Sequence, residues 1–199
     1  FKPDSKAAEE FLKQGFTVVQ SARQDGIFRG TAFVASLADD LPNNLVLKAD
    51  SQHFMAFSKG SSKQTYPSSL MGSIALIRQT LSDANWYQAA TSRENVTVNG
   101  QPLEFNAALA GLANVKQQGV LFDTSDERSL LRASKVLSEF DINNALLLGS
   151  GYEYSRLEQI KATGKPILLP LNFPAAPDVT TAEQARIAED AGAVAVMAL

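Results

Sequence analysis

The sequence contains no cysteine and a single histidine, His53, among its 199 residues. Disulfide bonds, cysteine nucleophiles and cysteine-ligated metals are therefore excluded within this chain. A metal site built on two histidines, such as a His-x-His pair or a His-Glu-x-x-His helix, is excluded in the same way. Next to Phe54, His53 is more typical of a structural side chain than of a ligand or a base, although its pKa range suits both roles.

Excess positive charge and long apolar segments are also missing. The net charge is −3 and no basic stripe runs through the sequence, so we expect no nucleic-acid partner. No apolar run approaches the roughly 20 residues of a membrane-spanning helix, so we expect no membrane partner. The Gly-x-Ser-x-Gly motif is absent, which argues against a Ser-His-Asp hydrolase. A cysteine-free composition fits any compartment, so the sequence leaves the localisation open.

The second half of the sequence alternates regularly. Short apolar runs of the length of buried parallel strands recur at intervals of about 25 residues, at 120–122, 145–148, 166–169 and 193–199. Amphipathic segments expected to be helices lie between them, at 125–140, 152–163 and 180–191. This alternation predicts parallel strands joined by right-handed helical crossovers.

Such an alternation fits either an open doubly wound sheet or a (β/α)8 barrel. The repeat length is close to that of a barrel, and no Gly-x-Gly-x-x-Gly motif follows the first strand, so we favour the barrel. The predicted class is an α/β fold, a partial or complete TIM-type (β/α)8 barrel with mostly parallel strands and outer helices. We expect residues 1–199 to form one such domain, and an incomplete one.

The first half of the chain predicts a less regular arrangement. Asp4 is placed to cap the first helix. Residues 50–67 are polar and serine-rich, which predicts a long loop, and Asn99-Gly100 is typical of the turn of a hairpin over 96–103. Strands are expected at 16–20, 31–36 and 45–49, and helices at 5–14, 67–87 and 105–118.

Candidate site residues follow the predicted strands, at the edge where the carboxyl ends of parallel strands meet. Gly149, Ser150 and Gly151 follow one strand, and their amides could face an anion or substrate, although a tight turn of small residues is the commoner explanation. Asp123 ends another strand and is a candidate catalytic residue, with capping of the next helix the commoner alternative. Asp178 carries the same two alternatives before the segment at 180–191.

Several segments outside this pattern carry a resemblance. They read GFTVVQSARQDGIFRG (15–30), SKGSSKQ (58–64), YPSSLMGSIALIRQT (66–80), LGSG (148–151), YSRLEQIKATG (154–164) and LPLNFP (169–174). Together they resemble a bacterial amidohydrolase related to imidazolonepropionase. The resemblance extends over about residues 1–177.

The resemblance implies a metal-dependent hydrolase on a (β/α)8 barrel, which attacks C–N bonds of amide or cyclic amide substrates with water bound to a divalent metal such as zinc. In that family a His-x-His pair follows the first strand, and Asp123 and Ser150 lie near positions where relatives often carry histidine. Because neither residue is histidine, the resemblance implies no metal ligands in this chain. We therefore expect zinc only in the full-length family, a small-molecule substrate, and a chain that is weakly active or inactive alone.

Residues 178–199, which read DVTTAEQARIAEDAGAVAVMAL, resemble the first βα unit of the synthase subunit of pyridoxal 5′-phosphate synthase, another (β/α)8 barrel. An aspartate at the position of Asp178 lies in that family's active site, which implies sugar-phosphate chemistry as a third functional class. The junction near residue 177 implies a chimera of barrel fragments.

A non-catalytic scaffold is the alternative to both enzyme classes. The apolar run at 193–199 is followed by no helix, and an open strand edge is prone to pairing with another chain. We therefore expect a homo-oligomer, or pairing with barrel strands that this chain lacks.

Overall fold

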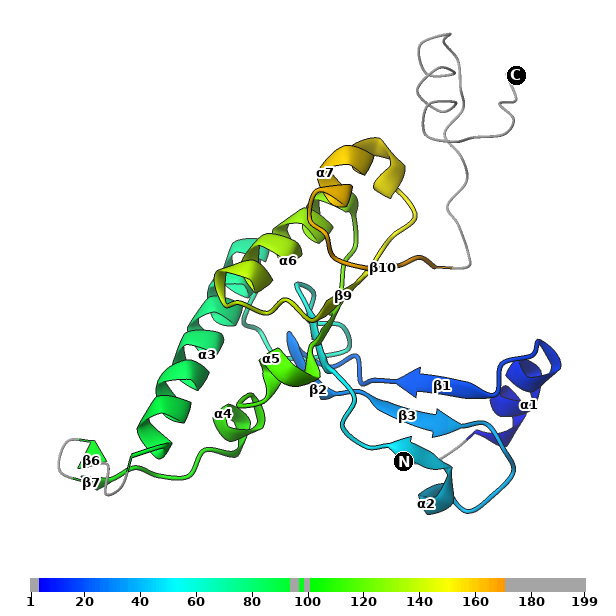
Figure 1. Ribbon diagram of the computed structural model, residues 1–199, viewed down its shortest axis with the longest axis horizontal. Helices are drawn as coiled ribbons and strands as arrows, with labels where there is room; N and C mark the ends of the chain where they lie inside the picture. The colour runs from blue at the N-terminus through cyan, green and yellow to red at the C-terminus, as the bar shows by residue number, and fades with distance from the viewer. Residues whose placement is uncertain (1–3, 94–96, 99–100, 171–199) are drawn as a thin grey trace, which may run out of the picture.

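The computed structural model describes residues 4–93, 97–98 and 101–170. These residues form an α/β structure with two separate sheets and a short hairpin. In Figure 1 the larger sheet carries two long helices along one side, and the smaller sheet lies beside it with its own short helices. The expected helix at 180–191, the expected strand at 193–199 and Asp178 lie outside the described residues.

The larger sheet has five strands in the order β10-β9-β8-β5-β2. Strands β5, β8, β9 and β10 are mutually parallel, whereas β2 runs antiparallel to β5 at one edge. Among the described residues β10 and β2 pair on one side only, so this part of the sheet is open and a closed barrel is not seen. The bounds are β2 (Phe28–Thr31), β5 (His53–Ala56), β8 (Val120–Asp123), β9 (Ala145–Leu148) and β10 (Ile167–Leu168).

Strand β5 lies inside this sheet, between β8 and the edge strand β2, whereas the sequence predicted a loop over residues 50–67. That prediction is wrong for His53–Ala56, all four residues of which are buried between β2 and β8. The run is short, and the segment around it is polar and serine-rich, so neither its length nor its alternation indicates a strand. Its backbone is satisfied by pairing on both edges, which only the assembled sheet provides.

Helices α3 (Leu70–Thr91) and α6 (Glu127–Glu139) cover one face of the five-stranded sheet (Figure 1). Met55, Phe122 and Leu147 lie opposite one another across β5, β8 and β9 and are fully buried beneath the helices. Burial of each such side chain contributes about 1.5–3 kcal/mol. The helices meet these strands mainly through Ile77, Leu81, Leu130, Ala133 and Leu137.

Both long helices begin at a polar cap. The Ser69 hydroxyl accepts from the Gly72 N–H at 3.1 Å at the start of α3. The Asp126 carboxylate accepts from the N–H groups of Arg128 and Ser129 at 2.9 and 2.8 Å at the start of α6. The alternative role of Asp123 as the cap of this helix is therefore wrong, because Asp126 is the cap.

The smaller sheet has three antiparallel strands in the order β1-β3-β4. Its elements are α1 (Ser5–Lys13), β1 (Val18–Ser21), β3 (Phe33–Ser36), α2 (Pro42–Leu45) and β4 (Val46–Lys48). The Asp4 carboxylate accepts from the N–H groups of Lys6 and Ala7, which confirms the predicted cap. No residue of α1 is buried, so this amphipathic helix leaves its apolar face open.

Ala32 separates the two sheets. The sequence predicted one strand over 31–36, but the chain leaves the larger sheet after β2 and enters the smaller one at β3. At this point the Ala32 N–H donates to the Gln52 carbonyl at 2.7 Å, and the Ser51 N–H donates to the Ala32 carbonyl at 2.8 Å. Ala32 is completely buried, so a small side chain fits the position.

The remaining elements are short. Strands β6 (Thr97–Val98) and β7 (Gln101–Pro102) pair antiparallel, as the predicted hairpin requires. The helix expected at 105–118 is divided into α4 (Ala107–Gly111) and α5 (Val115–Gln118) by a turn over 112–114, which follows Gly111 and ends at Asn114, two residues of low helix propensity. The helix expected at 152–163 is divided into η1 (Glu153–Arg156) and α7 (Leu157–Lys161). Within the described part of the chain, no helix has the length and apolar character needed to cross a membrane.

Candidate functional site

Asp123 lies at the carboxyl end of β8, between Ala56 of β5 and Leu148 of β9. Its carboxylate Oδ2 is 3.0 Å from Nη1 of Arg29. The two partners differ in exposure, since the Asp123 side chain is 39% exposed and that of Arg29 only 1%. Asp123 therefore presents a partly open carboxylate whose orientation is fixed by a buried cation.

Arg29 reaches this position from the edge strand β2. Its Nε donates to the Gly26 carbonyl at 3.1 Å, and its Nη2 donates to the Ser58 carbonyl at 3.2 Å. The guanidinium carbon lies 4.9 Å from the centre of the Phe54 ring, within the range of a cation–π contact. Every nitrogen of the guanidinium thus has a partner, as a buried charge requires.

The loop after β9 holds an anion supplied by the chain itself. The carboxylate of Glu153 accepts from the N–H groups of Ser150 and Gly151 at 2.6 and 2.8 Å, and from the Ser150 hydroxyl at 3.0 Å. Glu153 is only 6% exposed. The amides that the sequence predicted to face an anion therefore contact an internal carboxylate, and binding of a substrate anion by Gly149, Ser150 and Gly151 stays a prediction.

Gly149 is required by this arrangement. A Cβ atom at Gly149 would lie 2.9 Å from Oε1 of Glu153 and 3.2 Å from Oε2. These separations are closer than ordinary contacts, so any side chain at this position would displace the carboxylate. The small residue thus serves the turn and the Glu153 contact together.

The strand ends that carry Asp123 and Ser150 lie next to each other. Asp123 pairs in register with Leu148, one residue before Gly149. The hydroxyl of Thr124, which follows Asp123, donates to the Leu148 carbonyl and joins the two strand ends. The structure therefore brings these two candidate positions to one edge of the sheet. Asp178 and the junction expected near residue 177 lie outside the described residues. The role of Asp178 therefore stays a prediction.

His53 lies at the other end of its strand. It pairs with Val120, the first residue of β8, whereas Asp123 is the last. His53 is 5% exposed and its Nε2 has no hydrogen-bond partner. Burial lowers the pKa of His53, which Gln118 and Asp50 partly offset. A neutral imidazole at this position is a structural side chain, separated from the edge that carries Asp123.

The metal site implied by the resemblance is not formed by the described residues. In 4–93, 97–98 and 101–170, no group of three or more His, Cys, Asp or Glu side chains is arranged to hold a metal ion. Asp123 is already paired with Arg29, and the guanidinium would repel a cation placed beside it. The donor set of this part of the chain therefore does not fit zinc.

Sequence reasoning missed Arg29 and Glu153. Arg29 lies within a segment quoted for the amidohydrolase resemblance, but its partner follows it by many residues and belongs to a strand across the sheet. Glu153 lies near Ser150 in the sequence, and an acidic residue shortly after a Gly-Ser-Gly turn is a local signal that could have been used.

No protein-family model matches this chain, and no curated protein matches it. Among solved structures, the chain is similar to an amidohydrolase from Thermotoga maritima, with a TM-score of 0.68 and 18% sequence identity. The likeness covers 83% of this chain and 45% of that one, so this chain spans less than half of the other's length. At this identity the comparison shows a shared fold.

Proposed function

We propose that this chain forms part of a (β/α)8-barrel hydrolase of the amidohydrolase type, acting on the C–N bonds of amide or cyclic amide substrates. The observation that supports the proposal is the shared fold with the Thermotoga maritima amidohydrolase over 83% of the chain. The polar strand ends at Asp123 and Ser150 agree with it, because active sites of such barrels lie at the carboxyl ends of the strands.

In this proposal Asp123 binds the substrate. Its partly exposed carboxylate is placed to accept a hydrogen bond from an amide N–H, while Arg29 fixes its orientation. Ser150 is held by Glu153 at the neighbouring strand end and would line the same edge. Because the described residues do not fit a metal, we propose that the chain alone binds such substrates without hydrolysing them.

Hydantoin, a cyclic amide with two ring N–H groups, is a suitable probe. We expect weak binding by nuclear magnetic resonance titration, no turnover, and substoichiometric metal by elemental analysis. Asp123→Asn should weaken binding severalfold because a charged acceptor is lost. Asp141→Asn is the matched control, since Asp141 is an exposed surface aspartate. Binding that is absent, or unchanged in Asp123→Asn, would contradict the substrate role; turnover with stoichiometric metal would contradict the expected inactivity.

A non-catalytic scaffold that self-associates is the second candidate. Strand β10 pairs only with β9 among the described residues, and Leu168 and Leu169 beside this free edge are 49% and 48% exposed. Edges of this kind favour pairing with another chain. Light scattering should then show a dimer or larger species that Leu168→Lys reduces to monomer. A monomer at high concentration for the unmodified chain would contradict this candidate.

A further inference from the structure

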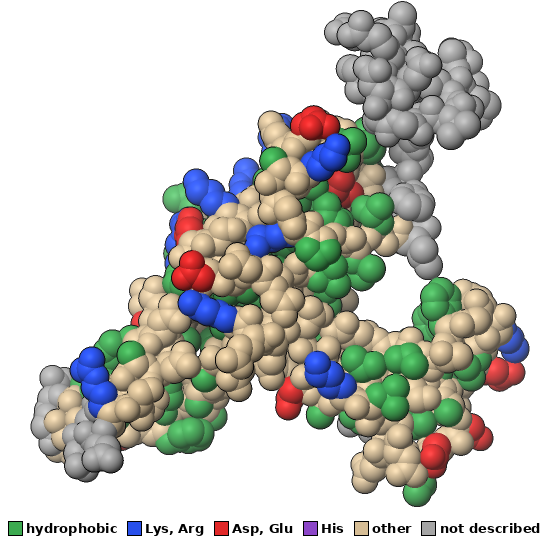
Figure 2. Space-filling model, in the orientation of Figure 1, with side chains coloured by type: hydrophobic (Ala, Val, Ile, Leu, Met, Phe, Trp, Pro, Cys, Tyr) green, Lys and Arg blue, Asp and Glu red, His purple; other side chains and the backbone are tan. Residues whose placement is uncertain are grey.

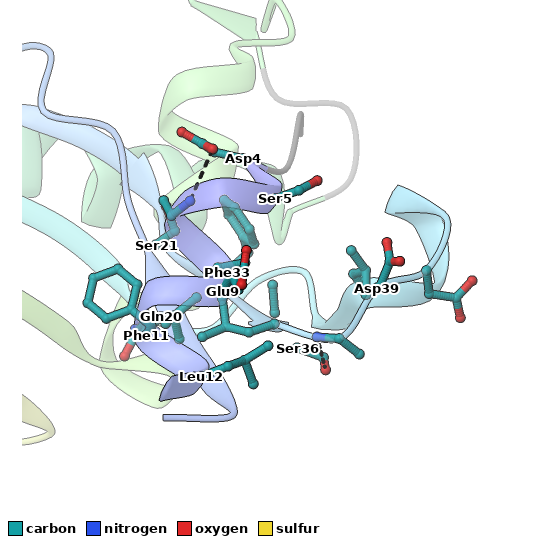
Figure 3. Close-up of a pocket in the computed structure, with 18 residues that line it drawn as sticks. Asp4, Ser5, Glu9, Phe11, Leu12, Gln20, Ser21, Phe33, Ser36 and Asp39 are labelled. Carbon is teal, nitrogen blue, oxygen red and sulfur yellow. Dashed lines mark hydrogen bonds between the residues drawn. The ribbon is translucent and has the colours of Figure 1, made fainter. Parts of the chain in front are cut away.

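A hollow lies between helix α1 and the three-stranded sheet, with a volume of about 690 Å³. Figure 3 shows Phe11 and Leu12 on the helix, with Phe33 of the sheet nearby and Ser36 and Asp39 on the far side of the hollow. Phe11 and Leu12 are 47% and 41% exposed, so the apolar wall of the helix is open to the hollow. The volume falls within the range of about 300–1,000 Å³ usual for sites that bind small molecules.

The margin of this hollow is acidic. Asp4, Glu9, Asp39 and Asp40 line it, and no Lys, Arg or His belongs to the lining in the described part of the chain. Figure 2 shows hydrophobic side chains on this part of the surface, with acidic side chains and also Lys or Arg side chains towards the edge of the molecule. Carboxylates around an apolar concavity produce a negative potential that attracts cations.

The four carboxylates differ in how far they are already used. Asp4 caps α1, Glu9 is 3.0 Å from the ammonium of Lys13, and Asp40 accepts from the Leu41 N–H at 2.6 Å. Asp39 forms no hydrogen bond or ion pair with any described residue. Asp39 is therefore the carboxylate best able to pair with a ligand.

We infer that this hollow binds a small hydrophobic cation, an organic ammonium whose apolar body contacts Phe11, Leu12 and Phe33 and whose charge lies beside Asp39. The inference does not depend on the proposed hydrolase, because neither Asp123 nor Glu153 lines the hollow.

Charge argues against two other occupants. Residues 171–199 carry four acidic side chains, Asp178, Glu183, Glu189 and Asp190, and one basic side chain, Arg186. A second copy of the chain has a net charge of −3. Both would bring negative charge towards an acidic margin, whereas a cation is attracted to it.

A series of three ligands with the same apolar body tests the inference. The 4-phenylbutylammonium ion, 4-phenylbutanol and 4-phenylbutanoate differ only in the charge of the head group. We expect calorimetric titration of the full chain to show the ammonium binding most tightly, the alcohol more weakly and the carboxylate least. Added salt should weaken binding of the ammonium ion more than binding of the alcohol, because salt screens the attraction between the ammonium and the carboxylates.

Variants then locate the charge. Asp39→Asn should weaken the binding of the ammonium ion by about two- to fivefold, the effect usual for one exposed ion pair. The affinity for the alcohol should stay unchanged. Glu10→Gln is the control, since Glu10 lies on α1 next to the hollow but does not line it. Circular dichroism should show that both variants are folded.

The inference is overturned if none of the three ligands binds, which is the result expected when residues 171–199 or a second copy fill the hollow. It is overturned equally if the alcohol binds as tightly as the ammonium, or if Asp39→Asn and Glu10→Gln have the same effect on ammonium affinity.

Discussion

Arg29 and Asp123 form an ion pair across a strand to which neither belongs. Arg29 lies on β2 and Asp123 on β8, with β5 between them, yet Nη1 and Oδ2 are 3.0 Å apart. The guanidinium reaches over the Phe54 ring of β5 to make the contact. The pair therefore joins three neighbouring strands at one edge of the sheet.

Breaking this pair should destabilise the fold unequally from its two ends. Arg29→Met removes the donors to Gly26 and Ser58 as well as the ion pair, and we expect a loss of about 2–4 kcal/mol in the free energy of unfolding. Asp123→Asn leaves a buried guanidinium without its counter-charge, but Asp123 is partly exposed, so we expect about 1–3 kcal/mol. Urea unfolding measures both.

The double variant separates the pair from its surroundings. If Arg29 and Asp123 interact as the distance indicates, the two losses should not add, and the coupling energy should exceed about 0.5 kcal/mol. Strictly additive losses would show that the ion pair contributes nothing to stability.

Glu153 should be sensitive even to a conservative change. In Glu153→Gln one carboxylate oxygen becomes an amide donor, which cannot accept from the N–H groups of Ser150 or Gly151. We expect a loss of about 1–3 kcal/mol, measured by thermal or urea unfolding. Glu158→Gln, on the exposed side of α7, should stay within about 0.5 kcal/mol of the unmodified chain. Equal stability of the two variants would contradict the role assigned to Glu153.

Gly149→Ala should be harmful only while Glu153 is present. The added methyl would lie 2.9 Å from the carboxylate, so we expect destabilisation in the unmodified chain. In a Glu153→Ala background the carboxylate is absent, so Gly149→Ala should lower the free energy of unfolding much less. Urea unfolding of the unmodified chain, the two single variants and the double variant gives the comparison. If Gly149→Ala destabilises the Glu153→Ala variant as much as the unmodified chain, another contact requires glycine.

His53 should make stability depend on pH. Burial lowers its pKa in the folded state, so the unfolded chain takes up a proton first as the pH falls. The stability present above the unfolded value of about 6.5 should therefore decrease as the pH falls from about 7 towards 5. Urea unfolding across this range measures the slope.

His53→Leu provides the control, because the chain contains no other histidine. The variant removes both the titration and the unpartnered Nε2, so its unfolding free energy should change much less between pH 7 and 5. A slope that persists in His53→Leu would assign the pH dependence to other groups.

The sequence allowed good predictions wherever local pattern and tertiary packing agree. Strands β8 and β9 and helix α6 were predicted within a few residues, because apolar runs and an amphipathic period mark elements buried on defined faces. Strand β5 was missed because four residues show no period, and their burial depends on partners distant in the sequence. Barrel closure depends on pairing between strands far apart in the sequence, which no local pattern reports, and it stays a proposal.

The candidate site was predicted in part for the same reason. Asp123 and Ser150 could be placed at one sheet edge, because parallel strands align their carboxyl ends. Their partners could not be predicted: Arg29 depends on the antiparallel addition of β2, and Glu153 on the fold of a loop. The polar contacts that fix a site are set by tertiary structure, whereas the strand that carries it is set by local pattern.

The two hydrogen bonds at Ala32 give the molecule a built-in reporter of motion. The Ala32 N–H lies between strands of different sheets, is buried, and donates to the carbonyl of Gln52. Its rate of exchange with deuterium therefore measures how often the two segments that connect the sheets, at Ala32 and at 51–52, open locally. If it exchanges as slowly as the amides at the centre of β8, this connection opens only together with the larger sheet; if it exchanges faster, the connection opens first.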